Sequence, residues 1–138
     1  MRAPAAPALS ALFLALPLML GACMPQDGPP TGAEDFATYC AACHGADGRG
    51  TGEIAADLTR RPADLTTIAR RNGGTFPMTR VMARIWGTRS PGDSHAVMPQ
   101  FAPLLDSELV PYDGGDGIET PTPIRLIRIA EYLRTLQG

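Results

Sequence analysis

The clearest hydrophobic pattern lies at the C-terminal end of the chain, where five apolar residues recur at the spacing of one helical face. They are Leu126, Ile129, Ala130, Leu133 and Leu136. Thr122 is expected to cap this helix and Pro123 to open it, because a proline is tolerated in the first helical turn. The pattern therefore predicts an amphipathic helix that begins at residue 123 and reaches the last turn of the chain.

Three further segments have the composition of short helices. Residues 34–43 begin with two acidic residues, which the helix macrodipole favours in a first turn. Residues 62–74 and 77–87 each begin with a proline and end with a glycine, as expected of helices with these residues at their two ends. Met78 and Met82 are four residues apart in the last segment, so we expect both to lie in the core.

The segment that leads into the C-terminal helix has no clear periodicity. Residues 88–123 contain six of the 14 prolines, and a turn of helix is expected only near residues 103–109. No segment has the alternating pattern of a strand. The sequence therefore predicts an all-α domain of three to five short helices with long loops, and such loops need something to pack on.

The first 22 residues have the features of a secretory signal peptide. Arg2 is followed by an apolar stretch over residues 9–20, which is too short to span a bilayer comfortably and is interrupted by Pro17. A transmembrane helix is the alternative. The sequence "LGAC" over residues 20–23 resembles the lipobox of bacterial lipoproteins. This resemblance implies cleavage before Cys23 and lipidation of that cysteine.

Export determines the compartment and restricts the partners. With a lipid anchor on Cys23, the chain is expected at the periplasmic face of the inner or the outer membrane, whereas cleavage without lipidation would release it into the periplasm. Residues 23–31 are rich in Pro and Gly and form a tether, and residues 32–138 form one small domain. Export and a formal net charge of −2 argue against nucleic acid as a partner.

The cysteines leave this small domain without a structural disulfide. Cys23 is assigned to the lipid, and Cys40 and Cys43 belong to one local motif, so the three cysteines offer no link between distant segments. A domain of this size is marginally stable without additional support. A bound apolar cofactor would enlarge its core.

The sequence "CAACH" over residues 40–44 has three interpretations. A thioredoxin-type motif belongs after a strand, and no strand is expected here. A structural zinc site needs four ligands, and the chain offers only Cys40, Cys43, His44 and His95, of which two are adjacent. Covalent haem attachment uses all three residues, because each thiol adds to a haem vinyl group and His44 ligates the iron. We therefore predict one covalently bound haem c with His44 as the proximal ligand.

The sixth iron ligand decides the chemistry of such a haem. Met98 is favoured, because it lies in an irregular segment that the following Pro99 stiffens. His95 and an open coordination site are the alternatives. With Met98 on the iron there is no vacant position for a substrate, which predicts an electron carrier and not an enzyme.

Together these features resemble those of the class I c-type cytochromes over about residues 32–138. The matching sequences are "CAACHG" at 40–45, "MP" at 98–99 and the terminal helix at 129–136. The resemblance implies an all-α fold wrapped around one haem with an exposed haem edge. It also implies that Gly32 and Phe36 contact the C-terminal helix. The expected partners are Ile129, Tyr132 and Leu133.

The chain departs from this family in charge and in length. It has no lysine, whereas family members often have lysines around the exposed haem edge, and residues 102–120 look longer than the minimal connection. Residues 49–89 contain eight arginines and three acids, and residues 93–119 contain six acids and no base. These are either two solvated surfaces or a dipole that orients the protein on an acidic partner. Arg89 and Trp86 are candidates for contact with a haem propionate, with apolar packing as the alternative for the tryptophan.

The resulting hypothesis is a lipid-anchored, periplasm-facing monohaem cytochrome that transfers electrons between respiratory or periplasmic redox partners. It acts as a monomer or as a subunit of a larger redox complex, in which residues 102–120 would form the interface. The alternative is a haem enzyme, or a sensor of gas or peroxide, in which Met98 is a labile ligand.

Overall fold

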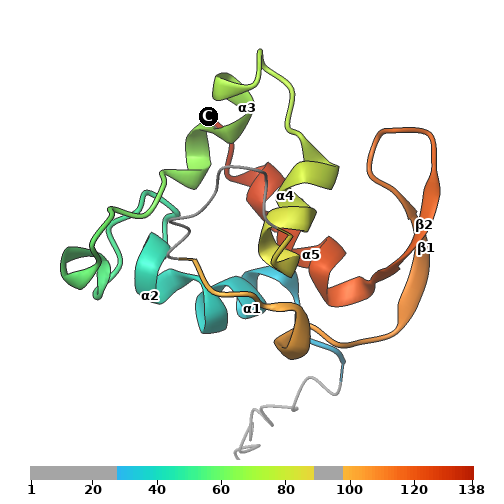
Figure 1. Ribbon diagram of the computed structural model, residues 1–138, viewed down its shortest axis with the longest axis horizontal. Coiled ribbons are helices and arrows are strands. Elements are labelled where there is room, and N and C mark those ends of the chain that lie inside the picture. Colours follow the sequence, from blue (N-terminus) through green and yellow to red (C-terminus); the bar gives the residue numbers. More distant parts are fainter. Residues whose placement is uncertain (1–27, 89–97) are drawn as a thin grey trace, which may run out of the picture.

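The computed structural model describes residues 28–88 and 98–138 and shows a helical domain with one β-hairpin at its side (Figure 1). The predicted signal peptide, Cys23, most of the tether, Arg89 and His95 lie outside the described residues. The helices are α1 (Gly32–Tyr39), α2 (Ala41–His44), α3 (Ile68–Arg71), α4 (Met78–Trp86) and α5 (Ile124–Thr135). Single 3-10 turns span Ala55–Asp57, Leu65–Thr67 and Ala102–Leu104, and the strands are β1 (Leu109–Asp113) and β2 (Glu119–Pro123).

Helix α1 begins at Gly32, two residues before the start expected from the sequence. The cause is a capping box formed by Thr31 and Glu34: the Thr31 hydroxyl accepts the Glu34 backbone N–H at 3.2 Å, and the Glu34 carboxylate accepts the Thr31 backbone N–H at 2.7 Å. The spacing Thr-x-x-Glu was the signal in the sequence that would have placed this boundary.

Gly32 lies where α1 crosses α5, as the family resemblance implied. A Cβ atom built on Gly32 would lie 2.0 Å from the carbonyl oxygen of Arg128 and 3.1 Å from the Cβ of Tyr132. One turn further along α1, the Phe36 ring packs against the Tyr132 ring with a centroid distance of 5.3 Å. The predicted contact between these helices is therefore confirmed, and it needs a residue without a side chain.

Gly32→Ala is accordingly expected to lower the free energy of unfolding by about 2 kcal/mol or more, because the clash is with backbone and the two helices must separate. Gly28→Ala is the matched control, since a Cβ atom at Gly28 meets nothing within 4 Å. Denaturant unfolding of both variants measures the difference. Equal stability of the two variants would contradict the close crossing.

The core forms between α1, α4 and α5. Helix α4 buries one face that includes Met78 and Met82, so their predicted core position is confirmed. Four residues of the predicted apolar stripe are buried on α5, and the fifth, Leu136, is half-buried just after the helix ends. Phe36 and Ile129 are almost completely buried at the centre. The amphipathic patterns therefore identified the core correctly.

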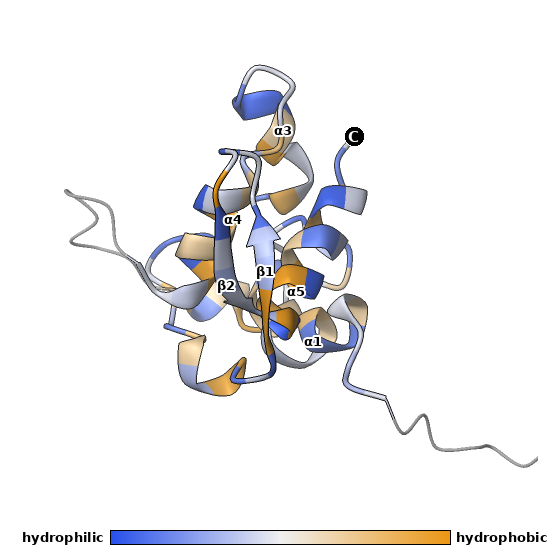
Figure 2. Cartoon of the chain, turned by 90° about the vertical axis from the view of Figure 1, so that its right-hand side faces the viewer, coloured by the Kyte–Doolittle hydropathy of each residue, from blue (hydrophilic) through white to orange (hydrophobic). Residues whose placement is uncertain are grey.

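The prediction of an all-α domain is wrong in one region, because residues 109–123 form an antiparallel hairpin. In Figure 2 this hairpin faces the viewer, with α4 and α5 behind it. The Tyr112 hydroxyl donates to the Glu131 carboxylate on α5 at 2.8 Å, and Gly114 abuts Thr79 on α4. Much of the 102–120 segment is thus a hairpin attached to the helices.

The hairpin was not predicted from the sequence, because prolines within a segment argue against a strand. Pro111 lies opposite Pro121, and Pro123 lies opposite Leu109. These pairs alternate with the hydrogen-bonded pairs of the ladder, so all three prolines occupy positions whose backbone nitrogen points away from the neighbouring strand. Prolines are tolerated at such positions because no ladder hydrogen bond is lost.

The hairpin also changes the start of α5. Thr122 lies in β2, and its hydroxyl donates to the Thr120 carbonyl at 2.8 Å, so its predicted role as the helix cap is wrong. Pro123 occupies the cap position and the helix begins at Ile124. In residues 28–88 and 98–138, no helix has the length and hydropathy needed to cross a bilayer.

Candidate haem site

Four of the predicted site residues line a single cavity of about 530 Å³. They are Cys40, Cys43, His44 and Met98. This volume lies within the range of about 300–1,000 Å³ that is usual for small-molecule and cofactor sites. The cavity is enclosed by α2, by the loop over residues 54–65 and by residues 98–101, with Arg84 contributed by α4. Residues far apart in the sequence therefore converge as the haem hypothesis requires.

Helix α2 places the Cys-x-x-Cys-His motif along one wall. Cys40 separates α1 from α2, and His44 is the last residue of α2, before the chain turns at Gly45 with a φ of 79°. Residues three and four apart lie on the same face of a helical turn. Both cysteines and the histidine therefore reach the cavity from one short segment, with Cys40 and His44 buried and Cys43 half-buried.

The orientation of the His44 ring suits a metal ligand. Its Nδ1 atom lies 3.0 Å from the carbonyl oxygen of Ala63. A carbonyl can only accept, so this contact places the ring proton on Nδ1 and leaves the lone pair on Nε2. Burial lowers the pKa of His44, against the opposing effect of the hydrogen bond to Ala63, and so favours the neutral imidazole that binds metals.

The two thiols do not have the surroundings of a redox disulfide pair. Burial raises the pKa of the Cys40 thiol to about 12, and the negative charge of Asp35 adds to this effect. Reactive redox cysteines have lowered pKa values instead. Both cysteines follow helix α1, whereas the thioredoxin motif follows a strand. These observations favour haem attachment over a thiol–disulfide function.

The loop that supports His44 depends on Gly50. The Gly50 backbone N–H donates to the His44 carbonyl at 2.7 Å, and Gly50 has a φ of 75°. A Cβ atom at Gly50 would lie 2.3 Å from the carbonyl oxygen of Pro62, which immediately precedes the Ala63 partner of the histidine ring. Gly50 therefore allows its own loop segment and the segment at Pro62 to approach each other beside His44.

Gly50→Ala is expected to lower the free energy of unfolding by at least about 2 kcal/mol more than Gly73→Ala. Gly73 is a matched control, because it has a similar φ of 68° but nothing within 4 Å of a built Cβ atom. The difference between the variants, measured by denaturant unfolding, therefore isolates the clash with Pro62. Equal losses would contradict the proposed close approach.

Met98, the predicted second iron ligand, also lines this cavity. Its side chain is half-buried and packs against the hydrophobic core. Three residues later, the Phe101 backbone N–H donates to the carbonyl oxygen of Ile85 on α4 at 3.2 Å. The Phe101 ring contacts the Tyr39 ring with a centroid distance of 6.4 Å, and both aromatic residues line the cavity. Met98 thus lines the same cavity as the cysteine motif, next to two aromatic side chains.

The remaining predictions about the site concern charge and hydrogen bonding. Trp86 is 37% exposed and is not among the cavity-lining residues, so its contact with a propionate remains a prediction.

Three arginines for which the sequence suggested no role in the site line the cavity. They are Arg60, Arg61 and Arg84. The pair "RR" directly before the Pro62–Ala63 support of His44 was the available signal. These side chains are suited to the propionates of a haem.

The residues present fit a covalently bound haem. Two thiols, a neutral imidazole and a thioether meet in one cavity, whose lining also includes Ile54, Leu58 and Leu65. A sequence model of the family Cytochrome c matches residues 30–110, which is more than half of the 138-residue chain. The chain belongs to the cytochrome c family. No curated protein matches the sequence.

Membership in the cytochrome c family indicates the cofactor, the usual role and the usual compartment of such a protein. The family binds haem c covalently, usually serves in electron transfer and not in catalytic turnover, and is typically extracytoplasmic. The mainly helical fold of this cytochrome, with five α-helices in its described residues, agrees with the family. The family match ends within β1, so β2 and α5 lie beyond it.

Proposed function

We propose that this cytochrome is a monohaem electron-transfer protein that faces the periplasm and exchanges electrons with respiratory or periplasmic redox partners. The observation that supports this proposal most directly is the convergence of Cys40, Cys43, His44 and Met98 on one cavity. This set would supply two attachment residues and two iron ligands for one haem, and it would leave no ligand position for a substrate.

Each residue would have a distinct role in this proposal. Cys40 and Cys43 would attach the haem through thioether bonds, and His44, through Nε2, and Met98 would hold the iron. When bound, the haem supplies a one-electron Fe(III)/Fe(II) couple. A thioether ligand favours the ferrous state and raises the reduction potential. The hydrogen bond from His44 Nδ1 to Ala63 would fix the orientation of the imidazole at the iron.

The protein around the site limits rearrangement during electron transfer. Tyr39 and Phe101 form part of the wall and are themselves tied to α1 and α4. With His44 and Met98 both holding the iron, neither side chain would need to leave it, and little structural change would accompany a change of oxidation state. These properties suit a carrier. They do not suit a haem enzyme, which needs an accessible iron.

Membrane attachment through Cys23 is a second part of the proposal. The Arg128 guanidinium donates to the carbonyl oxygens of Pro29 and Pro30 in the predicted tether, each at 3.1 Å. These contacts hold the end of the predicted tether against α5. An anchored cytochrome would meet membrane partners by diffusion in two dimensions.

The charge distribution supports an acidic redox partner. Arg60 and Arg61 are exposed at the cavity, whereas the hairpin and the residues before it are acidic. Such an arrangement orients a protein before contact and accelerates weak encounters. Electron transfer to the physiological partner is therefore expected to slow as the salt concentration rises. A rate that does not depend on salt would contradict this mode of docking.

Mass spectrometry and voltammetry of the exported protein test the function itself. The peptide that contains residues 40–44 is expected to have the added mass of one haem bound to both cysteines. A protein film on an electrode is expected to show one reversible one-electron couple. A peptide without haem, a second haem, or an irreversible couple would contradict the proposal.

A further inference from the structure

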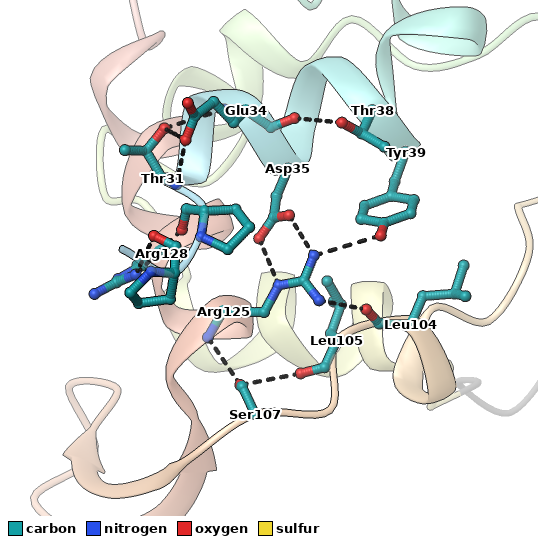
Figure 3. Close-up of polar contacts among 12 residues, drawn as sticks. Thr31, Glu34, Asp35, Thr38, Tyr39, Leu104, Leu105, Ser107, Arg125 and Arg128 are labelled. Carbon is teal, nitrogen blue, oxygen red and sulfur yellow. Dashed lines mark hydrogen bonds and ion pairs between the residues drawn. The ribbon is translucent and has the colours of Figure 1, made fainter. Parts of the chain in front are cut away.

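A charged pair joins α1 to α5, in which the carboxylate is buried and the guanidinium is partly buried. Asp35 on α1 is only 2% exposed, and Arg125 lies in the first turn of α5. The Arg125 guanidinium donates from Nε to one carboxylate oxygen of Asp35 at 3.0 Å and from Nη2 to the other at 2.5 Å (Figure 3). This bidentate geometry is the strongest form of contact between the two groups.

The same guanidinium also contacts two groups outside the ion pair. Its Nη1 atom donates to the carbonyl oxygen of Leu104 at 2.9 Å, and its Nη2 atom lies 3.4 Å from the Tyr39 hydroxyl (Figure 3). The guanidinium carbon lies 5.7 Å from the centroid of the Tyr39 ring. Arg125 therefore connects α5 to α1 and to the segment that follows Met98.

The residues that Arg125 contacts belong to the cavity or to the segment that follows Met98. Tyr39 lines the cavity beside Cys40, and Leu104 lies six residues after Met98. Residues 98–105 are held at three places along their length. The Phe101 N–H donates to Ile85, the Leu104 carbonyl accepts from Arg125, and Leu105 is fully buried. The backbone N–H of Arg125 also donates to the Ser107 hydroxyl at 3.2 Å.

Stability alone does not explain an ion pair at this position, because its carboxylate is buried. Replacement of such a pair by apolar residues is often neutral or stabilising, because desolvation of the charges offsets their attraction. Two apolar side chains would join α1 and α5 without either charge. They would not supply the additional donors that reach Leu104 and Tyr39. The arrangement therefore favours a role in which Arg125 fixes the position of the segment around Leu104 relative to α1 and α5.

We propose that Arg125 is a positioning residue for the axial ligand: it holds residues 98–105 against α1 and thereby keeps the Met98 thioether at the iron. This inference rests on the proposed role of Met98 as a ligand. Loss of the Arg125 contacts increases the fraction of molecules in which Met98 is detached. A competing ligand then binds with an apparent affinity that rises in proportion to that fraction.

The test uses the haem-loaded protein and imidazole as the competing ligand. The double variant Asp35→Leu/Arg125→Met removes both charges and leaves no buried carboxylate without a partner. We expect the imidazole concentration that abolishes half of the long-wavelength Met–iron absorption band to fall about tenfold or more, as for loss of a hydrogen bond to a charged group. The variant is also expected to bind CO faster in the ferrous state.

Arg128→Met is the matched control, because Arg128 lies on the same helix and its Nη1 atom donates to the carbonyl oxygens of Pro29 and Pro30, which do not line the cavity. We expect this variant to match the wild type in imidazole affinity and CO binding. Thermal unfolding of all variants separates the effect on ligation from an effect on stability. If Arg128→Met loosens Met98 as much as the double variant does, the inference is wrong.

Arg125→Lys provides a second test that does not depend on folding of the double variant. Lysine keeps the charge beside Asp35 but lacks the planar fork that reaches Asp35 and Leu104 together. We expect an increase in imidazole affinity relative to the wild type. Wild-type affinity in both Arg125 variants would overturn the inference. Absence of the Met–iron band from the wild type itself would instead overturn the proposed role of Met98.

Discussion

Met98→Ala is expected to lower the reduction potential by on the order of 0.1–0.3 V, within the total range of about 0.8 V that axial ligands cover. The thioether stabilises the ferrous state, and its removal also opens a coordination position. The ferrous variant is therefore expected to bind CO, whereas the wild type is not. Voltammetry and a CO difference spectrum measure the two effects independently. Both effects arise at the iron and do not require a change of fold.

Met82→Leu is the matched control for this variant. It removes a thioether from a buried position on α4 and nearly conserves the volume of the side chain. We expect its potential and its inertness to CO to equal those of the wild type. If Met98→Ala behaves like Met82→Leu, then Met98 is not the axial ligand. A wild type that binds CO would favour the enzyme or sensor hypothesis.

Replacement of both motif cysteines is expected to abolish covalent haem attachment. In Cys40→Ala/Cys43→Ala no thiol of the domain remains to form a thioether bond, so acidified organic solvent is expected to extract all of the haem. The wild type is expected to retain its haem under the same conditions. Haem staining after denaturing electrophoresis measures the retained fraction. Haem that stays attached to the double variant would contradict the assignment.

Cys23→Ala serves as the control for the third cysteine of the chain. It is expected to retain covalent haem and to lose lipidation, so that the protein moves from the membrane fraction to the soluble fraction. Loss of haem from this variant would assign Cys23 to the cofactor instead. A membrane association that does not depend on Cys23 would contradict the lipid anchor.

Local patterns identified the candidate haem-attachment motif, whose residues line one cavity, and predicted most of the helices. Cys40, Cys43 and His44 form a contiguous motif, and α4 follows directly from its apolar face, with Pro77 before it and Gly87 after it. Short-range chemistry determines such features, so they can be identified without a structure. The capping box at Thr31 was equally local and could have been identified from its spacing.

Features that depend on distant partners could not be predicted in this way. The hairpin contains prolines at positions that only the strand register makes acceptable. Asp35 and Arg125 are 90 residues apart, and each alone has the appearance of an ordinary surface charge. The carbonyl partner of His44 is a backbone atom 19 residues away, which no side-chain motif reveals. In all three cases, the determining contact is between segments that only the fold brings together.

Absorption spectra of the mature protein, oxidised and reduced, with and without CO, show whether the cavity holds a haem whose iron is ligated by Met98. We expect a reduced spectrum typical of haem c, a weak long-wavelength Met–iron band in the oxidised protein, and no change on addition of CO. A CO-induced shift in the wild type would contradict stable ligation by Met98. The absence of a haem spectrum from the exported protein would contradict the assignment of the cavity as a haem site.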